Sequence, residues 1–114
     1  MCNSELRSFQ QANNNFTSRN VTLVGISVDS PEETRALAQS QGYDFALLAD
    51  QGATTIRSYG VLHEHAGEKG KDIARPAEFL IDHGGTIRWV NLAPTVLSRL
   101  RPETVLDVID HLTR

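Results

Sequence analysis

The chain has 114 residues, of which 39% are hydrophobic and 22% charged, and its formal net charge is −3. This length fits one domain, 1–114, with a single hydrophobic core. Lys and Arg are neither in excess nor clustered, which argues against a nucleic-acid partner. The longest apolar run, VTLVGISV at 21–28, is too short to cross a bilayer, so no membrane association is expected.

The N-terminal segment has the pattern of an amphipathic helix, predicted from residue 4 to about residue 16. Its apolar residues recur on one side at helical spacing, and they are Leu6, Phe9 and Phe16. Gln10 and Gln11 fall on the outer side. The polar runs NNN at 13–15 and SRN at 18–20 favour a turn.

A strand, a helix and a second strand are predicted next. Residues 21–29 are nearly all apolar and rich in β-branched side chains, which is typical of a strand buried on both faces of a sheet. Ser30 to Glu33 has the sequence of a capping box with proline at the first helical position, so a helix should begin there and end at Gly42. The segment DFALLAD at 44–50 predicts a short strand.

The second half of the chain predicts a short helix, a loop, a hairpin and a terminal helix. Residues 51–60 favour the short helix, and the charged, glycine-rich segment 63–72 favours a loop. Strands at 77–82 and 86–91 flank the turn HGG, which is typical of an antiparallel hairpin. Pro102 begins a last amphipathic helix. This order predicts an α/β fold with a mixed sheet flanked by helices.

The sequence contains one cysteine, Cys2, directly before the first predicted helix. One thiol cannot form an internal disulfide, and a free thiol fits a reducing compartment, so we expect a cytoplasmic protein. Unpaired N–H groups at a helix N-terminus stabilise a thiolate and lower the thiol pKa from about 8.5. Arg75 is the best candidate for a further cation, because Arg7 points elsewhere on the same helix. The local sequence pattern alone is compatible with a catalytic role of Cys2 and with an inert thiol.

Four collinear segments resemble one protein family. They are CNSELRSF from Cys2, LVGISVDSPEE at 23–33, FALLADQGATTIRSYGVL at 45–62 and RPAEFLIDHGGTIRWV at 75–90. In the first segment, the order of Cys2, Ser4, Glu5, Leu6 and Phe9 is similar to the cysteine turn of the peroxiredoxins, the alkyl hydroperoxide reductase/thiol-specific antioxidant (AhpC/TSA) family.

The resemblance implies a thioredoxin-like fold and a thiol-dependent peroxidase without a cofactor. The thiolate of Cys2 would attack a hydroperoxide and become a sulfenic acid. Arg75 would stabilise the thiolate and polarise the peroxide, and Glu5 would orient that arginine or support the helix start. Ser4 and Pro76 would support the active site. An external thiol reductant, of the thioredoxin or glutaredoxin kind, would resolve the sulfenic acid, since the chain has no second cysteine.

Two departures from the family pattern keep other functions open. The residues that precede the family cysteine, Thr or a Cys-Pro pair, have no counterpart here, so Met1 resembles an internal residue. Pro76 holds the place of the usual arginine, and Arg75 stands one position earlier. A proline there is similar to thioredoxin-like oxidoreductases, in which it faces the thiol. Thiol–disulfide exchange is therefore the alternative activity.

The strand that precedes the cysteine helix in the family is also missing, so the chain is expected to be truncated at its N-terminus. Without that strand the sheet keeps unpaired edges, which favours strand exchange or oligomerisation. We expect the 114-residue chain either to self-associate or to be part of a longer one. A redox-inactive interaction domain is the remaining alternative of this kind.

A metal site is an alternative of a different class. HEH at 63–65, with Asp72 or His83, contains side chains that bind zinc. The triplet lies in a polar predicted loop, and no second cluster has the spacing of a ligand set. We therefore expect no metal.

Overall fold

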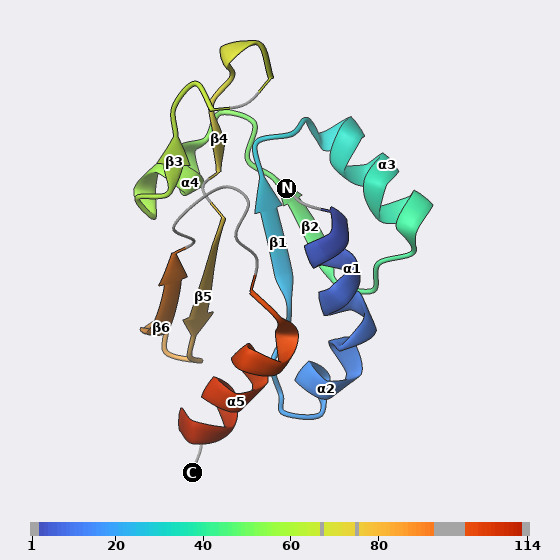
Figure 1. Cartoon of the computed structure of the whole chain (residues 1–114), viewed down its shortest axis with the longest axis vertical. Coiled ribbons are helices and arrows are strands. Elements are labelled where there is room, and N and C mark those ends of the chain that lie inside the picture. Colours follow the sequence, from blue (N-terminus) through green and yellow to red (C-terminus); the bar gives the residue numbers. More distant parts are fainter. Residues whose placement is uncertain (1–2, 67, 75, 93–99, 113–114) are drawn as a thin grey trace.

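The computed structural model describes residues 3–66, 68–74, 76–92 and 100–112. The elements are α1 (Asn3–Gln11), α2 (Asn13–Thr17), β1 (Val24–Ser27), α3 (Pro31–Gln41), β2 (Ala46–Ala49), α4 (Thr54–Ser58), β3 (Leu62–His63), η1 (Glu68–Gly70), β4 (Ile73–Ala74), β5 (Ala77–Ile81), β6 (Ile87–Leu92) and α5 (Pro102–Leu112). In the view of Figure 1, α1, α2 and α3 lie on one side of β1 and the β5–β6 hairpin on the other. None of the helices in these ranges has the length and apolar character that a membrane crossing requires.

The N-terminal segment forms two short helices instead of the predicted single one. They meet at Ala12, whose backbone angles (φ −95°, ψ 2°) depart from helical geometry. The asparagines at 13–15 belong to α2, so the turn predicted there is wrong, whereas the turn at 18–20 is confirmed. Phe16 is fully buried and stacks on Phe9 with ring centroids 5.7 Å apart. Burial of these rings outweighs the low helix propensity of asparagine.

The strands β1 and β2 pair in parallel, and α3 is the crossover between them. The predicted limits of α3 are confirmed. The backbone N–H of Glu33 donates to Ser30 Oγ, and the N–H of Ser30 donates to the Glu33 carboxylate, which is the reciprocal capping box. Gly42 ends the helix with a φ of 66°, in the left-handed region.

The prediction that the strand at 21–29 is buried on both faces is wrong. Only residues 24–27 form β1, and Val24 at its start is 52% exposed. Leu48 of β2 is 50% exposed. Within the described ranges, β2 is the only strand that pairs with β1. A parallel pair without further neighbours cannot bury the apolar side chains that a central strand carries.

The segment 63–72 contains more structure than the predicted loop. His63 already belongs to β3, which pairs antiparallel with β4, and the short 3-10 segment η1 lies between them. The N–H of His65 donates to Asp72 Oδ1 at 2.9 Å, and His65 Nδ1 lies 3.0 Å from the carbonyl oxygen of Gly70. Polar contacts hold this segment together. The segment therefore lacks the hydrophobic periodicity from which strands are predicted.

The hairpin of β5 and β6 is confirmed, and Asp82 holds its turn. Asp82 Oδ1 accepts from the N–H groups of Thr86 at 2.9 Å and Gly84 at 3.0 Å. The pKa of Asp82 lies below its ordinary value. The hydrogen bond from Thr86 is the largest cause, and the bond from Gly84 and the guanidinium of Arg88 lower the pKa further. Gly85 supplies the left-handed residue with a φ of 85°.

The main core cluster joins the N-terminal helices to α5. Its buried members are Phe16, Val105, Leu106 and Ile109. Leu80 and Trp89 of the hairpin are half-buried and pack against it. Beside the cluster, Arg19 donates from Nε and Nη2 to the two carboxylate oxygens of Asp110 at 2.7 and 3.1 Å, and this bond raises the pKa of Arg19. Apolar packing of α2 and a two-pronged ion pair from the turn that follows it therefore connect this part of the chain with α5.

Parallel and antiparallel strand pairs both occur, as a mixed sheet predicts, but in the described residues they belong to separate sheets. In the described part of the chain, the strands form three two-stranded sheets, β1–β2, β3–β4 and β5–β6. One edge of β1 and one edge of β5 consequently have no described strand partner. The expectation that this chain lacks the strand that precedes the cysteine helix in the family stays a prediction.

A polar contact fixes α1 to the segment before β2. Gln10 Nε2 donates to Asp44 Oδ2 at 2.8 Å, and Asp44 N–H donates to Gln10 Oε1 at 2.7 Å. On the apolar side of the helix, Leu6 is only 6% exposed. The helix is therefore held on two sides, and Gln10 is not the outward-facing residue that the helical pattern indicated.

We predict that Phe16→Ala lowers the free energy of unfolding by about 3–5 kcal/mol, because it removes a fully buried ring from the junction of α2 and α5. Urea denaturation measures the change. Phe45→Ala, at a half-buried ring that stacks on Tyr43, is the control and should have the smaller effect. Equal losses for the two variants would contradict the assignment of Phe16 as the central core residue.

We predict that Gln10→Ala lowers the free energy of unfolding by about 1 kcal/mol, because both hydrogen bonds to Asp44 are lost. Gln11, the exposed neighbour, offers a matched control, and Gln11→Ala should change stability by less than about 0.5 kcal/mol. The same urea titration compares them. If the two variants were equally stable, the contact would not hold α1.

Candidate functional site

The candidate active site is the N-terminal end of α1. The helix begins at Asn3, the residue after Cys2, so the prediction of a helix directly behind the cysteine is confirmed. Cys2 itself lies outside the described residues. Because α1 runs antiparallel to β1 in Figure 1, its first turn lies level with the carboxyl end of that strand. Open α/β folds bind their ligands beyond the carboxyl ends of the strands.

The first turn of α1 contains the predicted acidic residue. Glu5 is half-buried there, at the end of the helix where a carboxylate is electrostatically favoured. Ser4 is part of the same turn by its backbone, and its side chain is outside the described part. Arg7 is exposed, in agreement with the expectation that it points elsewhere. The described part of the first turn therefore places an acidic side chain, Glu5, close to Cys2 in the sequence.

The second predicted part of the site lies between β4 and β5. Pro76 is half-buried and directly precedes β5. In Figure 1, β5 starts at about the height at which α1 starts, on the other side of β1. Arg75 lies outside the described residues, and so does its bond to Pro76. The two segments thus begin at a similar level along the long axis of the molecule, and the contact of Arg75 with Cys2 or Glu5 stays a prediction.

Gln10 and Asp44 are the site-positioning residues that the sequence did not reveal. They fix the far end of α1, and with it the direction in which the N-terminus of the helix points. They are 34 positions apart, and neither belongs to a recognisable motif. Only the pairing of a glutamine with an acidic residue could have suggested the contact, and many other pairs in the chain match that description.

Two of the residues considered as metal ligands, His65 and Asp72, contact each other. Asp72 Oδ1 accepts from the N–H of His65 and lies 3.9 Å from His65 Nδ1, so both residues close the β3–β4 segment. The His65 side chain is 80% exposed. Among the residues that the structure describes, no three His, Cys, Asp or Glu side chains are grouped to hold a metal ion.

Comparisons with known proteins agree on one family. The profile of the AhpC/TSA family matches residues 1–90. Alkyl hydroperoxide reductase C of Buchnera aphidicola subsp. Baizongia pistaciae is 32% identical over 119 residues, covering 98% of this chain and 57% of that protein. Peroxiredoxin 2 of Picrophilus torridus is 29% identical over 114 residues, covering 95% and 54%. The chain thus spans little more than half the length of these curated relatives.

Solved structures show the same relationship in three dimensions. The mitochondrial 2-cys peroxiredoxin of Plasmodium falciparum superposes with a TM-score of 0.85 at 26% identity, over 99% of this chain and 67% of that one. The family profile covers most of the chain, and the solved relative matches nearly all of it. The chain belongs to the AhpC/TSA family and has the thioredoxin-like fold of the peroxiredoxins.

Proposed function

We propose that this chain is the catalytic part of a thiol-dependent peroxidase with Cys2 as the reacting residue. The observation that carries the proposal is the start of α1 directly behind the only cysteine, in a chain of the AhpC/TSA family. The names of the relatives, alkyl hydroperoxide reductase and peroxiredoxin, support peroxide reduction over disulfide exchange. They also give no support to a redox-inactive domain.

The reaction is a nucleophilic displacement on oxygen. The Cys2 thiolate attacks the distal oxygen of a hydroperoxide, an S–O bond forms and the O–O bond breaks. The leaving oxygen takes a proton and departs as water or an alcohol, while Cys2 becomes a sulfenic acid. The step needs a thiolate at neutral pH and a cation beside the leaving oxygen, and no metal or organic cofactor takes part.

The start of α1 cannot lower the thiol pKa far enough alone. A charge at a helix end gains roughly 0.3–1 kcal/mol from the dipole, whereas one pKa unit corresponds to about 1.4 kcal/mol. Glu5, in the first turn, opposes the thiolate by repulsion between like charges. A nearby cation is therefore required, and Arg75 supplies it, since it precedes the strand β5, which starts at about the height at which α1 starts in Figure 1. Glu5 then orients Arg75.

An external thiol completes the cycle. The chain contains one cysteine, so the sulfenic acid condenses with a thiol of another molecule, which a thioredoxin- or glutaredoxin-like protein provides. Such reductants operate in a reducing compartment, which is consistent with a cytoplasmic protein. Self-association of the chain belongs to the same proposal. Its support is the edge of β1 that has no described strand partner, together with the exposed apolar residues Val24 of β1 and Leu48 of β2.

We predict that hydrogen peroxide converts Cys2 to a sulfenic acid that a dimedone reagent traps. Mass spectrometry should place the label on Cys2, because it is the only thiol of the chain. Cys2→Ser should abolish the label entirely. Free cysteine is the reference, and the peroxide concentration and time are chosen so that it stays unreacted. If the unmodified protein carried no label under these conditions, the peroxidase assignment would be contradicted.

We predict that Arg75→Met raises the pKa of the Cys2 thiol by roughly one to three units, because a nearby cation is lost. The pH dependence of the alkylation rate with iodoacetamide measures this pKa. Arg7→Met removes the same charge from an exposed position of α1 and should leave the pKa nearly unchanged. Equal pKa values in the two variants would exclude Arg75 from the site.

A further inference from the structure

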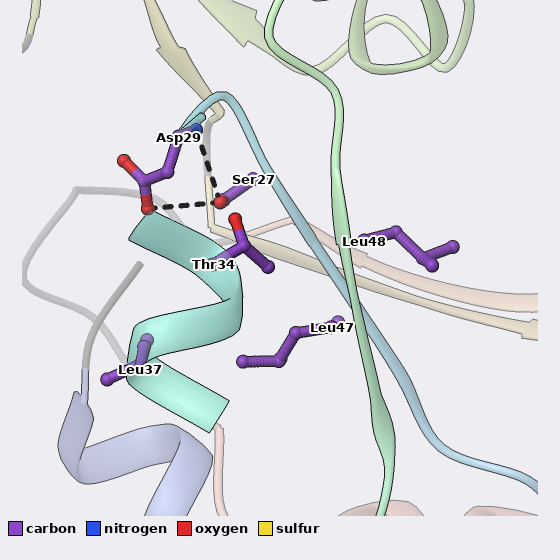
Figure 2. A pocket seen from close by; sticks show the side chains of 7 residues that line it. Ser27, Asp29, Thr34, Leu37, Leu47 and Leu48 are labelled. Carbon is purple, nitrogen blue, oxygen red and sulfur yellow. Dashed lines mark hydrogen bonds between the residues drawn. The ribbon is translucent and has the colours of Figure 1, made fainter. Parts of the chain in front are cut away.

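A small cavity lies between the first turns of α3 and the parallel strands β1 and β2 (Figure 2). It offers about 10 Å³ for the centre of a water molecule. Its apolar walls come from Leu37, Leu47 and Leu48. Its polar lining is Ser27, Asp29 and Thr34, from the end of β1 and the start of α3. It lies outside the residues assigned to the peroxidase site.

Thr34 places a hydroxyl at this cavity without a hydrogen-bond partner in the described part of the chain. The residue is only 7% exposed, and its Oγ1 makes no hydrogen bond to any described residue. A threonine in a helix can satisfy its hydroxyl on the carbonyl four residues earlier. Here the carbonyl of Ser30 accepts from the backbone N–H of Thr34 at 2.9 Å and takes no bond from the hydroxyl. A buried hydroxyl left in this state is costly.

Beside Thr34, the carboxylate of Asp29 can accept a further hydrogen bond. Ser27, which is 8% exposed, donates from Oγ to Asp29 Oδ2 at 3.1 Å and accepts from the N–H of Asp29 at 3.3 Å. The hydroxyl proton of Ser27 is therefore used, and Asp29 retains acceptor sites on its carboxylate. Figure 2 shows the hydroxyl of Thr34 pointing towards Ser27 and Asp29.

We propose that this cavity binds one water molecule, which accepts a hydrogen bond from Thr34 Oγ1 and donates one to the Asp29 carboxylate. The available space is near the 10–15 Å³ that one water needs, and the site offers the two or more polar partners that an ordered water requires. The carboxylate disfavours an anion at this site. The bound water connects the first turns of α3 to the end of β1, independently of the chemistry of Cys2.

NMR spectroscopy of the protein tests the proposal directly, with water itself as the probe. A long-lived bound water should give nuclear Overhauser contacts to the Thr34 methyl group. Thr34→Ser keeps the hydroxyl, so a contact should persist at the β-protons of the substituted side chain. Thr34→Val replaces the hydroxyl by a methyl group of similar size, and the contact should disappear. Thr104→Val, at an exposed position of α5, should leave the contact to Thr34 intact. No contact in the unmodified protein, or an unchanged one in Thr34→Val, would overturn the proposal.

Stability gives a second readout that separates a hydrated hydroxyl from an unpaired one. If water satisfies Thr34, Thr34→Val loses hydrogen bonds and should lower the urea midpoint relative to Thr104→Val. If the hydroxyl is simply unpaired, its replacement by a methyl group removes a buried polar group and should raise the midpoint. A raised midpoint would therefore overturn the proposal.

Discussion

The contact of Phe16 with the apolar stripe of α5 connects the two ends of this chain. A nine-residue helix such as α1 is not stable alone in water, so its order depends on what it packs against. The stack of Phe9 on Phe16, the burial of Leu6 and the bonds of Gln10 to Asp44 supply that support. The chemistry proposed for Cys2 needs the backbone N–H groups at the start of α1. Reactivity at one end of the helix consequently depends on packing at the other.

The candidate site combines effects that oppose each other. The helix start favours a thiolate, while Glu5 in the same turn disfavours it. In this account Arg75 resolves the conflict, because one guanidinium pairs with both negative groups. In this proposal the Glu5 carboxylate fixes the long, flexible side chain of Arg75 at the position where charge develops on the leaving oxygen. The residues proposed to activate the thiol, Arg75 and Glu5, differ from those that hold α1 in place, so the site depends on both sets.

Local signals in the sequence were sufficient for much of the fold. The capping box of Ser30 and Glu33, the stop at Gly42 and the hairpin around Asp82 depend on neighbours in sequence, and each is present. The helical asparagines at 13–15 and the exposure of Val24 depend on packing with distant residues. The local sequence pattern therefore gave wrong predictions for both. At the site, the helix behind Cys2 and the acidic first turn were predictable, whereas the contact of Gln10 with Asp44 was not, because no local rule connects them.

The central claim is that the folded chain activates Cys2. Ultraviolet absorbance of the thiolate, followed through a pH titration, gives the thiol pKa of the protein in buffer and again in concentrated urea. The account predicts a pKa well below about 8.5 in the folded protein and a return to that ordinary value on unfolding. An equal pKa in both states would show that neither α1 nor Arg75 acts on Cys2, and would contradict the account.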